Sequence, residues 1–303
     1  MPLHFGDRLA ERVAARESQV VLGLDPDPTR LWPASGSTEA GGAAAQAAAD
    51  AVALHCEAVI AAAGAACVAI KPQLACFERL GAPGWAALRH VVEHAHAHEL
   101  LVVADAKRGD ISVSAAAYAQ ALLGRTPTPF GDVDGLSADA ATVNPLLGRD
   151  ALEPFLAVAG EAGAGLFVLV RTSNPGAADV QDLELAEGGP LWERLARLTA
   201  EAGSGRVGQS GLSDVGAVVG ATAPVHLERA RELMPAAVFL LPGIGAQGGR
   251  VEDLAPAFAP GRAAGLVTAS RAIVDAHLET GGDPASAARK AAEAIRAAAW
   301  GLA

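Results

Sequence analysis

Short, nearly continuous apolar runs alternate along the chain with alanine-rich stretches that have helical spacing. Such runs are typical of parallel strands that are buried on both faces. We expect eight strands, at residues 20–25, 67–71, 101–107, 141–144, 166–171, 217–221, 238–243 and 264–270. The helical stretches between and after them are residues 46–63, 84–98, 112–123, 149–160, 191–202, 225–233 and 285–299.

Strands that alternate with helices predict βαβ units and a parallel sheet. Eight strands within 303 residues fit an α/β fold of the (β/α)8 TIM-barrel type, with extended loops. A doubly wound open sheet is the alternative, but its dinucleotide-binding form needs a G-x-G-x-x-G turn that does not follow the first strand here. We therefore predict one TIM-barrel domain over residues 1–303, without an internal repeat or a linker.

Three stretches are longer than ordinary connections, namely residues 26–45, 124–139 and 174–190. Loops of this length in a compact domain are usually lids, binding loops or disordered segments. The first and the third begin at the carboxyl ends of predicted strands, which is the face where TIM-barrel enzymes hold their active sites.

Composition narrows the class of protein. Hydrophobic residues make up 51% and charged residues 19%, which excludes a disordered chain. The formal charge of −11 argues against a general binder of nucleic acid or of anionic membranes. Cys56, Cys67 and Cys76 are too few for a disulfide framework and indicate reduced thiols. The longest uncharged apolar run, between Glu57 and Lys71, is too short to span a bilayer as a helix, and the N-terminal residues lack the apolar core of a signal peptide, so we expect a cytoplasmic protein.

Several predicted strands end in a charged residue. Asp25 ends the first and Lys71 the second, Asp105 and Lys107 lie in the third, and Arg271 follows the eighth. One such residue can simply mark the change from strand to loop. Together, however, adjacent barrel strands would point these side chains at one region, where buried charges need opposite partners.

The segment DAKRGD has the highest density of charge. Asp105 and Lys107 are two residues apart and so share one face of an extended strand, and Asp110 lies where the chain turns toward the next helix. Neighbouring carboxylates keep a lysine in its charged form. This favours a proton donor to a carbanion over a Schiff-base nucleophile, which needs a lowered pKa.

Two features predict a phosphate site. The turn PGIGAQGG at 242–249 follows the seventh strand, and its glycines would let backbone N–H groups approach an anion. Arg271 adds a planar guanidinium suited to bidentate phosphate binding. The loops after strands seven and eight are the recurrent phosphate site of TIM barrels.

A metal site is not predicted. His94 and His98 are four residues apart on a helix, as metal ligands can be, but only glutamates lie near them, so a solvated helix face is the expected role.

These residues together resemble the orotidine 5′-phosphate decarboxylase family, in its longer bacterial branch. The family motif D-x-K-x-x-D reads here as Asp105, Lys107 and Asp110. A lysine that ends the second strand matches Lys71 in IKPQLACFE, and an aspartate that ends the first matches Asp25 in GLDPDP.

The similarity continues into the second half of the chain. TSNPGA is similar to the family's pyrimidine-reading loop, with Ser173 at the position that contacts the base. PGIGAQGG matches the phosphate loop with Gln247 as its side-chain ligand, and Arg271 matches the phosphate arginine.

The resemblance implies decarboxylation of orotidine 5′-phosphate to UMP and CO2, without metal or cofactor. Lys107 would protonate C6, Asp105 would lie near the substrate carboxylate, and Lys71 and Asp25 would hold the ribose hydroxyls. The protein would stabilise the carbanion electrostatically, in a site arranged beforehand.

The resemblance also implies a homodimer with shared active sites. In the family the aspartate at the position of Asp110 crosses to the partner's site, as do residues at the positions of Ile111 and Ser114. No nucleic-acid or membrane partner is expected.

Two alternatives remain open at this point. Magnesium-dependent sugar-phosphate decarboxylases and aldolases of the same suprafamily, such as 3-keto-L-gulonate 6-phosphate decarboxylase, share D-x-K-x-x-D but have a glutamate where Lys71 stands, and a lysine there would repel the metal. A non-catalytic phosphate-binding barrel would keep the glycine turn and Arg271 but would not need the Asp/Lys array.

Overall fold

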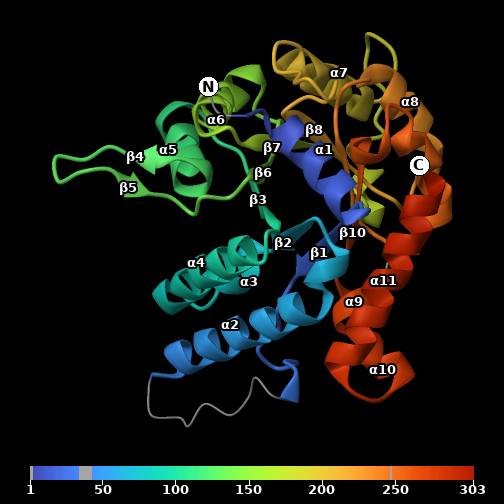
Figure 1. Ribbon diagram of the computed structural model, residues 1–303. Helices are drawn as coiled ribbons and strands as arrows, with labels where there is room; N and C mark the ends of the chain where they lie inside the picture. Colours follow the sequence, from blue (N-terminus) through green and yellow to red (C-terminus); the bar gives the residue numbers. More distant parts are fainter. Residues whose placement is uncertain (1–2, 34–42, 246–247) are drawn as a thin grey trace.

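Eight parallel strands close into a barrel in the computed structural model, which describes residues 3–33, 43–245 and 248–303 (Figure 1). Around the barrel the order is β1 (Val20–Leu24), β10 (Gly265–Ala269), β9 (Phe239–Leu241), β8 (Val215–Val219), β7 (Gly165–Arg171), β6 (Ala140–Val143), β3 (Leu101–Arg108) and β2 (Ala69–Pro72). Each apolar run expected to be a strand forms one of them. The predicted TIM barrel is confirmed, and the open-sheet alternative is wrong.

Helices surround this barrel, and each expected helix is present. They are α2 (Ala44–Ala63), α4 (Ala82–Ala97), α5 (Ser112–Leu123), α6 (Arg149–Ala162), α7 (Leu191–Gly203), α8 (Leu227–Leu233) and α11 (Pro284–Leu302). Short helices that the sequence pattern did not reveal are α3 (Leu74–Glu78), α9 (Arg271–Val274) and α10 (Ala276–Thr280). Among the described residues, 3-10 segments lie at Gly64–Ala66, Pro175–Ala177, Pro224–His226, Val251–Phe258 and Arg262–Ala264.

An unexpected helix, α1 (Phe5–Arg16), closes one end of the barrel. Its buried residues Phe5, Leu9 and Val13 are four positions apart and belong to the same apolar cluster as the inward-facing strand residues. The ring of Phe5 packs edge-on against that of Phe167 in β7, with 6.0 Å between the centroids. The helix therefore fills the amino-terminal end of the barrel with apolar side chains.

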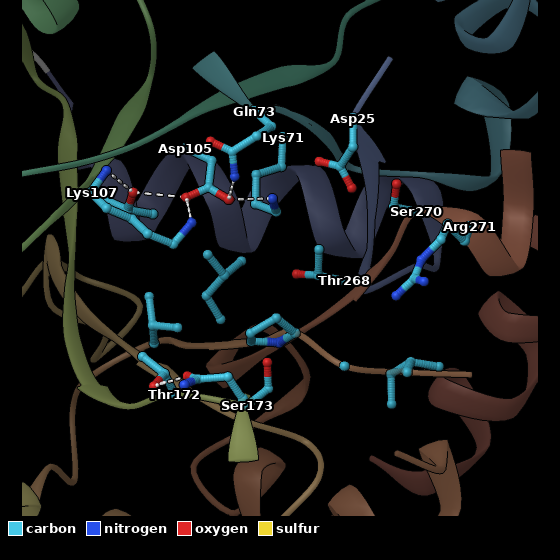
Figure 2. A pocket seen from close by; sticks show the side chains of 17 residues that line it. Asp25, Lys71, Gln73, Asp105, Lys107, Thr172, Ser173, Thr268, Ser270 and Arg271 are labelled. Carbon is cyan, nitrogen blue, oxygen red and sulfur yellow. Dashed lines mark hydrogen bonds and ion pairs between the residues drawn. The ribbon is translucent and has the colours of Figure 1, made fainter. Parts of the chain in front are cut away.

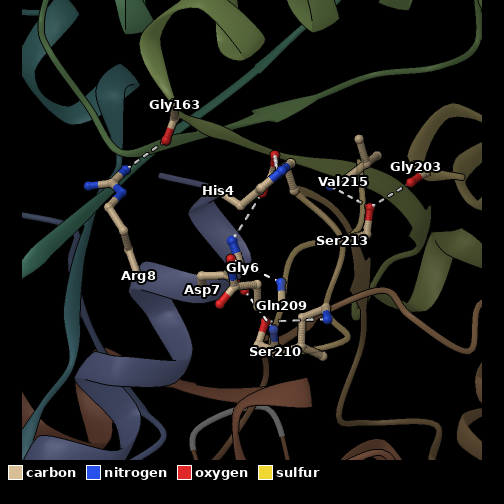
Figure 3. Close-up of polar contacts among 12 residues, drawn as sticks. His4, Gly6, Asp7, Arg8, Gly163, Gly203, Gln209, Ser210, Ser213 and Val215 are labelled. Carbon is tan, nitrogen blue, oxygen red and sulfur yellow. Dashed lines mark hydrogen bonds and ion pairs between the residues drawn. The ribbon is translucent and has the colours of Figure 1, made fainter. Parts of the chain in front are cut away.

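Polar contacts fasten α1 to the surrounding loops (Figure 3). The carboxylate of Asp7 accepts the backbone N–H groups of Gln209 at 3.0 Å and Ser210 at 2.7 Å. Arg8 donates to the carbonyl oxygen of Gly163 at 2.9 Å. Because this end of the barrel is closed, the carboxyl ends of the strands are where a ligand can reach the interior.

The helix α2 is long and apolar enough to cross a membrane by length and composition, and it is the one such helix within the described ranges. A core helix passes the same test. Here α2 packs between α4 and α11, and Val52, Cys56, Val59 and Ile60 are buried in the main apolar cluster. We therefore interpret it as one of the barrel's outer helices.

The three long loops lie at different places. Residues 174–190 follow β7 and so start at the carboxyl ends of the strands. Residues 26–45 start there too, although 34–42 lie outside the described residues. Residues 124–139 instead contain a hairpin of β4 (Arg125–Thr126) and β5 (Val133–Asp134) that projects from the body of the molecule (Figure 1). This hairpin links α5 to β6, which places it at the amino-terminal end of the barrel strands.

Candidate active site

A cavity of about 430 Å³ opens at the carboxyl ends of the strands (Figure 2). The strands β1, β2, β3, β7 and β10, together with the residues just after them, each supply polar side chains to it. Predicted site residues that line it are Asp25, Lys71, Asp105, Lys107, Ser173 and Arg271. The structure therefore brings together six side chains that lie up to 246 positions apart in the sequence.

Asp105 is at the centre of the charged array. Its Oδ2 accepts from Nζ of Lys71 at 2.5 Å and from Nε2 of Gln73 at 3.2 Å. Its Oδ1 accepts from Nζ of Lys107 at 2.5 Å and from Oγ1 of Thr142 at 3.0 Å. Four donors thus hold one buried carboxylate in a single orientation, which is the arrangement that makes a buried charge tolerable.

The electrostatics of the array follow from burial and pairing. Burial alone would raise the pKa of Asp105, but the charges of Lys71 and Lys107 and their hydrogen bonds outweigh it and lower that pKa to about 2. Burial would lower the pKa of Lys71, but the charges of Asp105 and Asp25 outweigh it and raise that pKa above its usual value. Both groups are therefore charged at neutral pH.

The backbone at Lys107 differs from the extended strand that the sequence analysis assumed. Lys107 has a φ of +47°, in the left-handed region that costs an ordinary L-residue about 1–2 kcal/mol. The β3–β6 pairing also shifts register between Ala104 and Arg108. Asp105 and Lys107 still meet, but through this irregularity rather than through the regular two-residue repeat of a strand.

Ser173 lies at the opposite rim of the cavity from the charged array (Figure 2). It follows β7, and its carbonyl oxygen accepts from the hydroxyl of Thr222 at 3.1 Å. A Cβ added at Gly220 would lie 2.7 Å from Cα of Ser173, so only glycine permits this approach. The loop after β8 thus supports the backbone that carries Ser173.

The glycine turn and Arg271 form the other end of the cavity. Gly243 and Gly245 have φ values of +110° and +72°, and N–H of Gly245 donates to the carbonyl of Gly249 at 3.0 Å. Arg271 begins α9 and directs its guanidinium into the same space (Figure 2). Gln247, the predicted phosphate ligand, lies outside the described residues.

The remaining predicted site residues do not line this cavity. Asp110 accepts the N–H of Ile111 at 2.8 Å, while Ile111 and Ser114 are exposed at the start of α5. Their expected roles concern the partner's site, and that expectation stays a prediction.

Sequence reasoning assigned no role to several polar residues of the cavity, among them Gln73, Thr142 and Thr268. Gln73 and Thr142 hydrogen-bond to Asp105, and the Thr268 hydroxyl is buried without a hydrogen-bond partner among the described residues. The two threonines could have been found from the sequence, because each lies in an otherwise apolar buried strand. A buried hydroxyl needs either a hydrogen-bond partner within the protein or a ligand.

Potential metal ligands do not gather in the described part of the chain, where no group of three His, Cys, Asp or Glu residues is placed to hold an ion. Nδ1 of His98 instead donates to the carbonyl oxygen of His94 at 2.9 Å, and Nε2 of His96 lies 3.0 Å from Oδ2 of Asp139. In the cavity the carboxylate of Asp105 is paired with the ammonium group of Lys71.

A closed barrel with a lysine–aspartate array at the carboxyl ends of its strands, and a glycine turn beside an arginine, defines a TIM-barrel enzyme. The model of the orotidine 5′-phosphate decarboxylase / HUMPS family matches residues 18–291, and the chain belongs to this family. The resemblance inferred from the motifs is therefore confirmed.

Individual relatives agree with this assignment. The chain is 43% identical over 284 residues to orotidine 5′-phosphate decarboxylase of Haloarcula marismortui, covering 90% of this chain and 87% of that one. It is 47% identical over 233 residues to the enzyme of the same name from Deinococcus radiodurans, covering 77% and 78%. A solved structure from Streptomyces avermitilis superimposes with a TM-score of 0.80 at 34% identity, covering 100% of this chain and 97% of that one.

Proposed function

We propose that this chain decarboxylates orotidine 5′-phosphate to UMP and CO2, the step that forms UMP in pyrimidine biosynthesis, without metal or cofactor. The observation that carries the proposal is the buried Asp105 carboxylate, paired at 2.5 Å with both Lys71 and Lys107 inside the cavity. The names of the relatives and the family membership support the same reaction.

The chemistry requires an electrostatic site. When the bond from C6 to the carboxyl carbon breaks, CO2 leaves and the electron pair stays on C6, where no conjugated electron sink accepts it. A cation placed beforehand at C6 stabilises that charge without reorganisation. Lys107 supplies this cation, and its Nζ transfers a proton to C6 to give UMP.

Asp105 and Lys71 set the conditions for this step. Because its pKa is lowered to about 2, Asp105 is a carboxylate at neutral pH and lies near the substrate carboxylate, so departure of CO2 removes a like-charge repulsion. Lys71, buried against the other oxygen of Asp105, balances the charge and holds that carboxylate in place.

The rest of the cavity binds the nucleotide. Arg271 and the 242–249 turn, with Gln247, hold the phosphate, Ser173 contacts the base, and Asp25 with Lys71 holds the ribose hydroxyls. The positions of Ser173 and Arg271 at separate ends of the cavity support this assignment (Figure 2). Binding energy from the remote phosphate then assists the chemistry at C6.

The proposal includes a homodimer in which Asp110, Ile111 and Ser114 enter the partner's active site. Ile111 and Ser114 are exposed and Asp110 is half-buried, and all three follow β3, a strand that lines the cavity; this supports the dimer part of the proposal. Residues 1–303 act in this proposal as one catalytic domain, and the cytoplasmic location rests on the sequence expectation.

The reaction is tested by following the absorbance of orotidine 5′-phosphate, with and without exhaustive chelation. We expect turnover that a chelator leaves unchanged. Loss of activity on chelation would favour the magnesium-dependent alternative, and tight UMP binding without CO2 release would favour a non-catalytic barrel.

The role of Lys107 is tested in the same assay. Lys107→Ala should lower kcat by about 10³-fold or more, because both the local cation and the proton donor are lost. Lys290→Ala, which removes an exposed lysine on α11, is the matched control and should keep full activity. Substantial decarboxylation by a folded Lys107→Ala variant would remove Lys107 from the central role.

A further inference from the structure

Because the backbone of β3 is irregular, the amide N–H of Lys107 does not donate to a backbone carbonyl in the hydrogen-bond ladder between β3 and β6. The register of the two strands is regular through Ala104 and resumes only at Arg108, which pairs with Val143. Between these points the N–H of Lys107 donates to a side chain, Oγ1 of Thr142, at 2.8 Å. Thr142 thus replaces the backbone acceptor that the bulge removes.

The same hydroxyl also contacts the catalytic carboxylate. Oγ1 of Thr142 donates to Oδ1 of Asp105 at 3.0 Å, and that oxygen accepts from Nζ of Lys107 at 2.5 Å. The hydroxyl therefore links the main chain of Lys107 to the carboxylate that holds its ammonium, in one closed ring of hydrogen bonds. Thr142 is 1% exposed, so water does not compete for these contacts.

We propose that Thr142 is a positioning residue for the proton donor: its hydroxyl holds Lys107 in the left-handed backbone conformation and so fixes where the ammonium lies. The inference rests on the proposed roles of Asp105 and Lys107. A hydroxyl is suited to this task because it accepts one hydrogen bond and donates another, and the β-branched side chain has few rotamers.

Removal of the hydroxyl should affect chemistry more than binding. Without it the amide of Lys107 has no buried acceptor, and the left-handed conformation loses the contact that compensates its strain. Lys71 and Gln73 would still hold Oδ2 of Asp105. The groups at the phosphate end of the cavity would be unchanged, so the nucleotide would still bind while the ammonium of Lys107 is misplaced.

The experiment compares Thr142→Val, which keeps the shape and lacks the hydroxyl, with Thr142→Ser, which keeps the hydroxyl. For each we would measure kcat and KM for orotidine 5′-phosphate, and the inhibition constant of UMP. We expect kcat of Thr142→Val to fall about 10- to 100-fold, as for a reacting group displaced by about 1 Å. KM and UMP inhibition should stay within about threefold, and Thr142→Ser should recover most of the lost kcat.

Thr142→Ala and Thr142→Ser form a second pair that differs only in the hydroxyl, and they test the same point should the valine variant not fold. Equal kcat in the two members of a pair would overturn the inference, as would a parallel loss of kcat and UMP affinity. Lys107→Ala separates the two proposals. If it is inactive while Thr142→Val is fully active, only the role of Thr142 fails, and if it is active, the proposed role of Lys107 itself fails.

Discussion

The balance of charge at single residues explains how this cavity can hold two lysines. Lys71 and Lys107 carry two positive charges, and Asp105 with Asp25 carries two negative charges, so the array is neutral as a whole. In the proposed reaction, a substrate carboxylate that enters beside Asp105 would disturb this balance, and its loss as CO2 would restore it. Because both lysines pair with the carboxylate of Asp105, protonation of this carboxylate at low pH should lower the stability of the folded protein.

The lowered pKa of Asp105 predicts an acid-labile contribution to stability. Because the folded-state pKa of about 2 lies below the usual 3.8, the contribution is complete above pH 3.8 and is lost as the pH falls toward 2. Its size is about 2 kcal/mol. The raised pKa of Lys71 has the opposite effect on the pH dependence of stability. Its contribution to the free energy of unfolding is complete below the usual pKa of 10.5 and is lost at higher pH.

Urea unfolding of the wild type and of Asp105→Asn between pH 6 and pH 2 measures this contribution. The stability difference between the two proteins should shrink by about 2 kcal/mol across that range. Asp132→Asn on the exposed hairpin is the control, and its difference from the wild type should stay constant. A difference between wild type and Asp105→Asn that does not change with pH would contradict the pairing described here.

At the residue scale, the sequence predicted that these charged side chains lie together but not the backbone geometry that brings them into contact. Asp105 and Lys107 were expected together because they are two residues apart, and Lys71 because adjacent parallel strands end at one rim. The left-handed backbone of Lys107 could not be predicted, because a non-glycine residue in that region has no signature in sequence. Thr142 was within a predicted strand, but its contact requires the bulge.

At the scale of elements, β7 and the loop that follows it form one unit. Arg171 at the end of β7 donates to both oxygens of Asp182, at 2.8 and 2.9 Å. The backbone N–H of Thr172 donates to Oε1 of Gln181 at 2.8 Å. These contacts tie the 174–190 loop to the strand end directly before Ser173, so the loop positions the residue proposed to contact the base.

We expect Asp182→Ala to loosen this loop. Arg171 is only 8% exposed, and loss of its partner should lower the free energy of unfolding by about 2 kcal/mol. KM for orotidine 5′-phosphate should rise about tenfold while kcat changes less, because the loop affects binding of the base rather than the charged array.

Steady-state kinetics and chemical unfolding check both parts of this prediction. Asp179→Ala, in the same loop but exposed, is the matched control and should change neither quantity. If Asp182→Ala lowers stability but leaves KM unchanged, the loop does not position Ser173.

The elements differed in how well the sequence predicted them. Barrel strands and outer helices were recognised because strands buried on both faces give continuous apolar runs and helices between them give alanine-rich stretches. The helix α1 was missed although Phe5, Leu9 and Val13 repeat every four residues, because charged residues dominate the segment between them. The hairpin β4–β5 was missed because its strands have two exposed residues each and leave no pattern.

At the scale of the whole molecule, the outer face of α5 is unlike that of a helix at a water-exposed surface. Its twelve residues, SVSAAAYAQALL, carry no charge, yet Val113 is 83% exposed and Tyr118 is 37% exposed. Ile111, just before the helix, is 51% exposed. An apolar helix face of this kind is more typical of an interface than of a solvated surface, which supports the proposed contact with a second copy.

Shared active sites predict that two inactive variants can complement each other. In Lys107→Ala the proposed proton donor is missing, and in Asp110→Ala the residue proposed to enter the partner's site is missing. A hybrid dimer then contains one site with the intact Lys107 of one subunit and the intact Asp110 of the other, and one site that lacks both. In a two-fold dimer with random exchange, about a quarter of wild-type activity should return.

Decarboxylation measured before and after mixing tests this arrangement, with exchange followed by mass spectrometry of one isotope-labelled subunit. Lys107→Ala mixed with a protein that carries both substitutions is the control, because no hybrid of that pair has an intact site. If exchange is complete and activity does not return, each site uses only its own Asp110. The exposed start of α5 would then need another explanation, since in its own subunit Asp110 does not line the cavity.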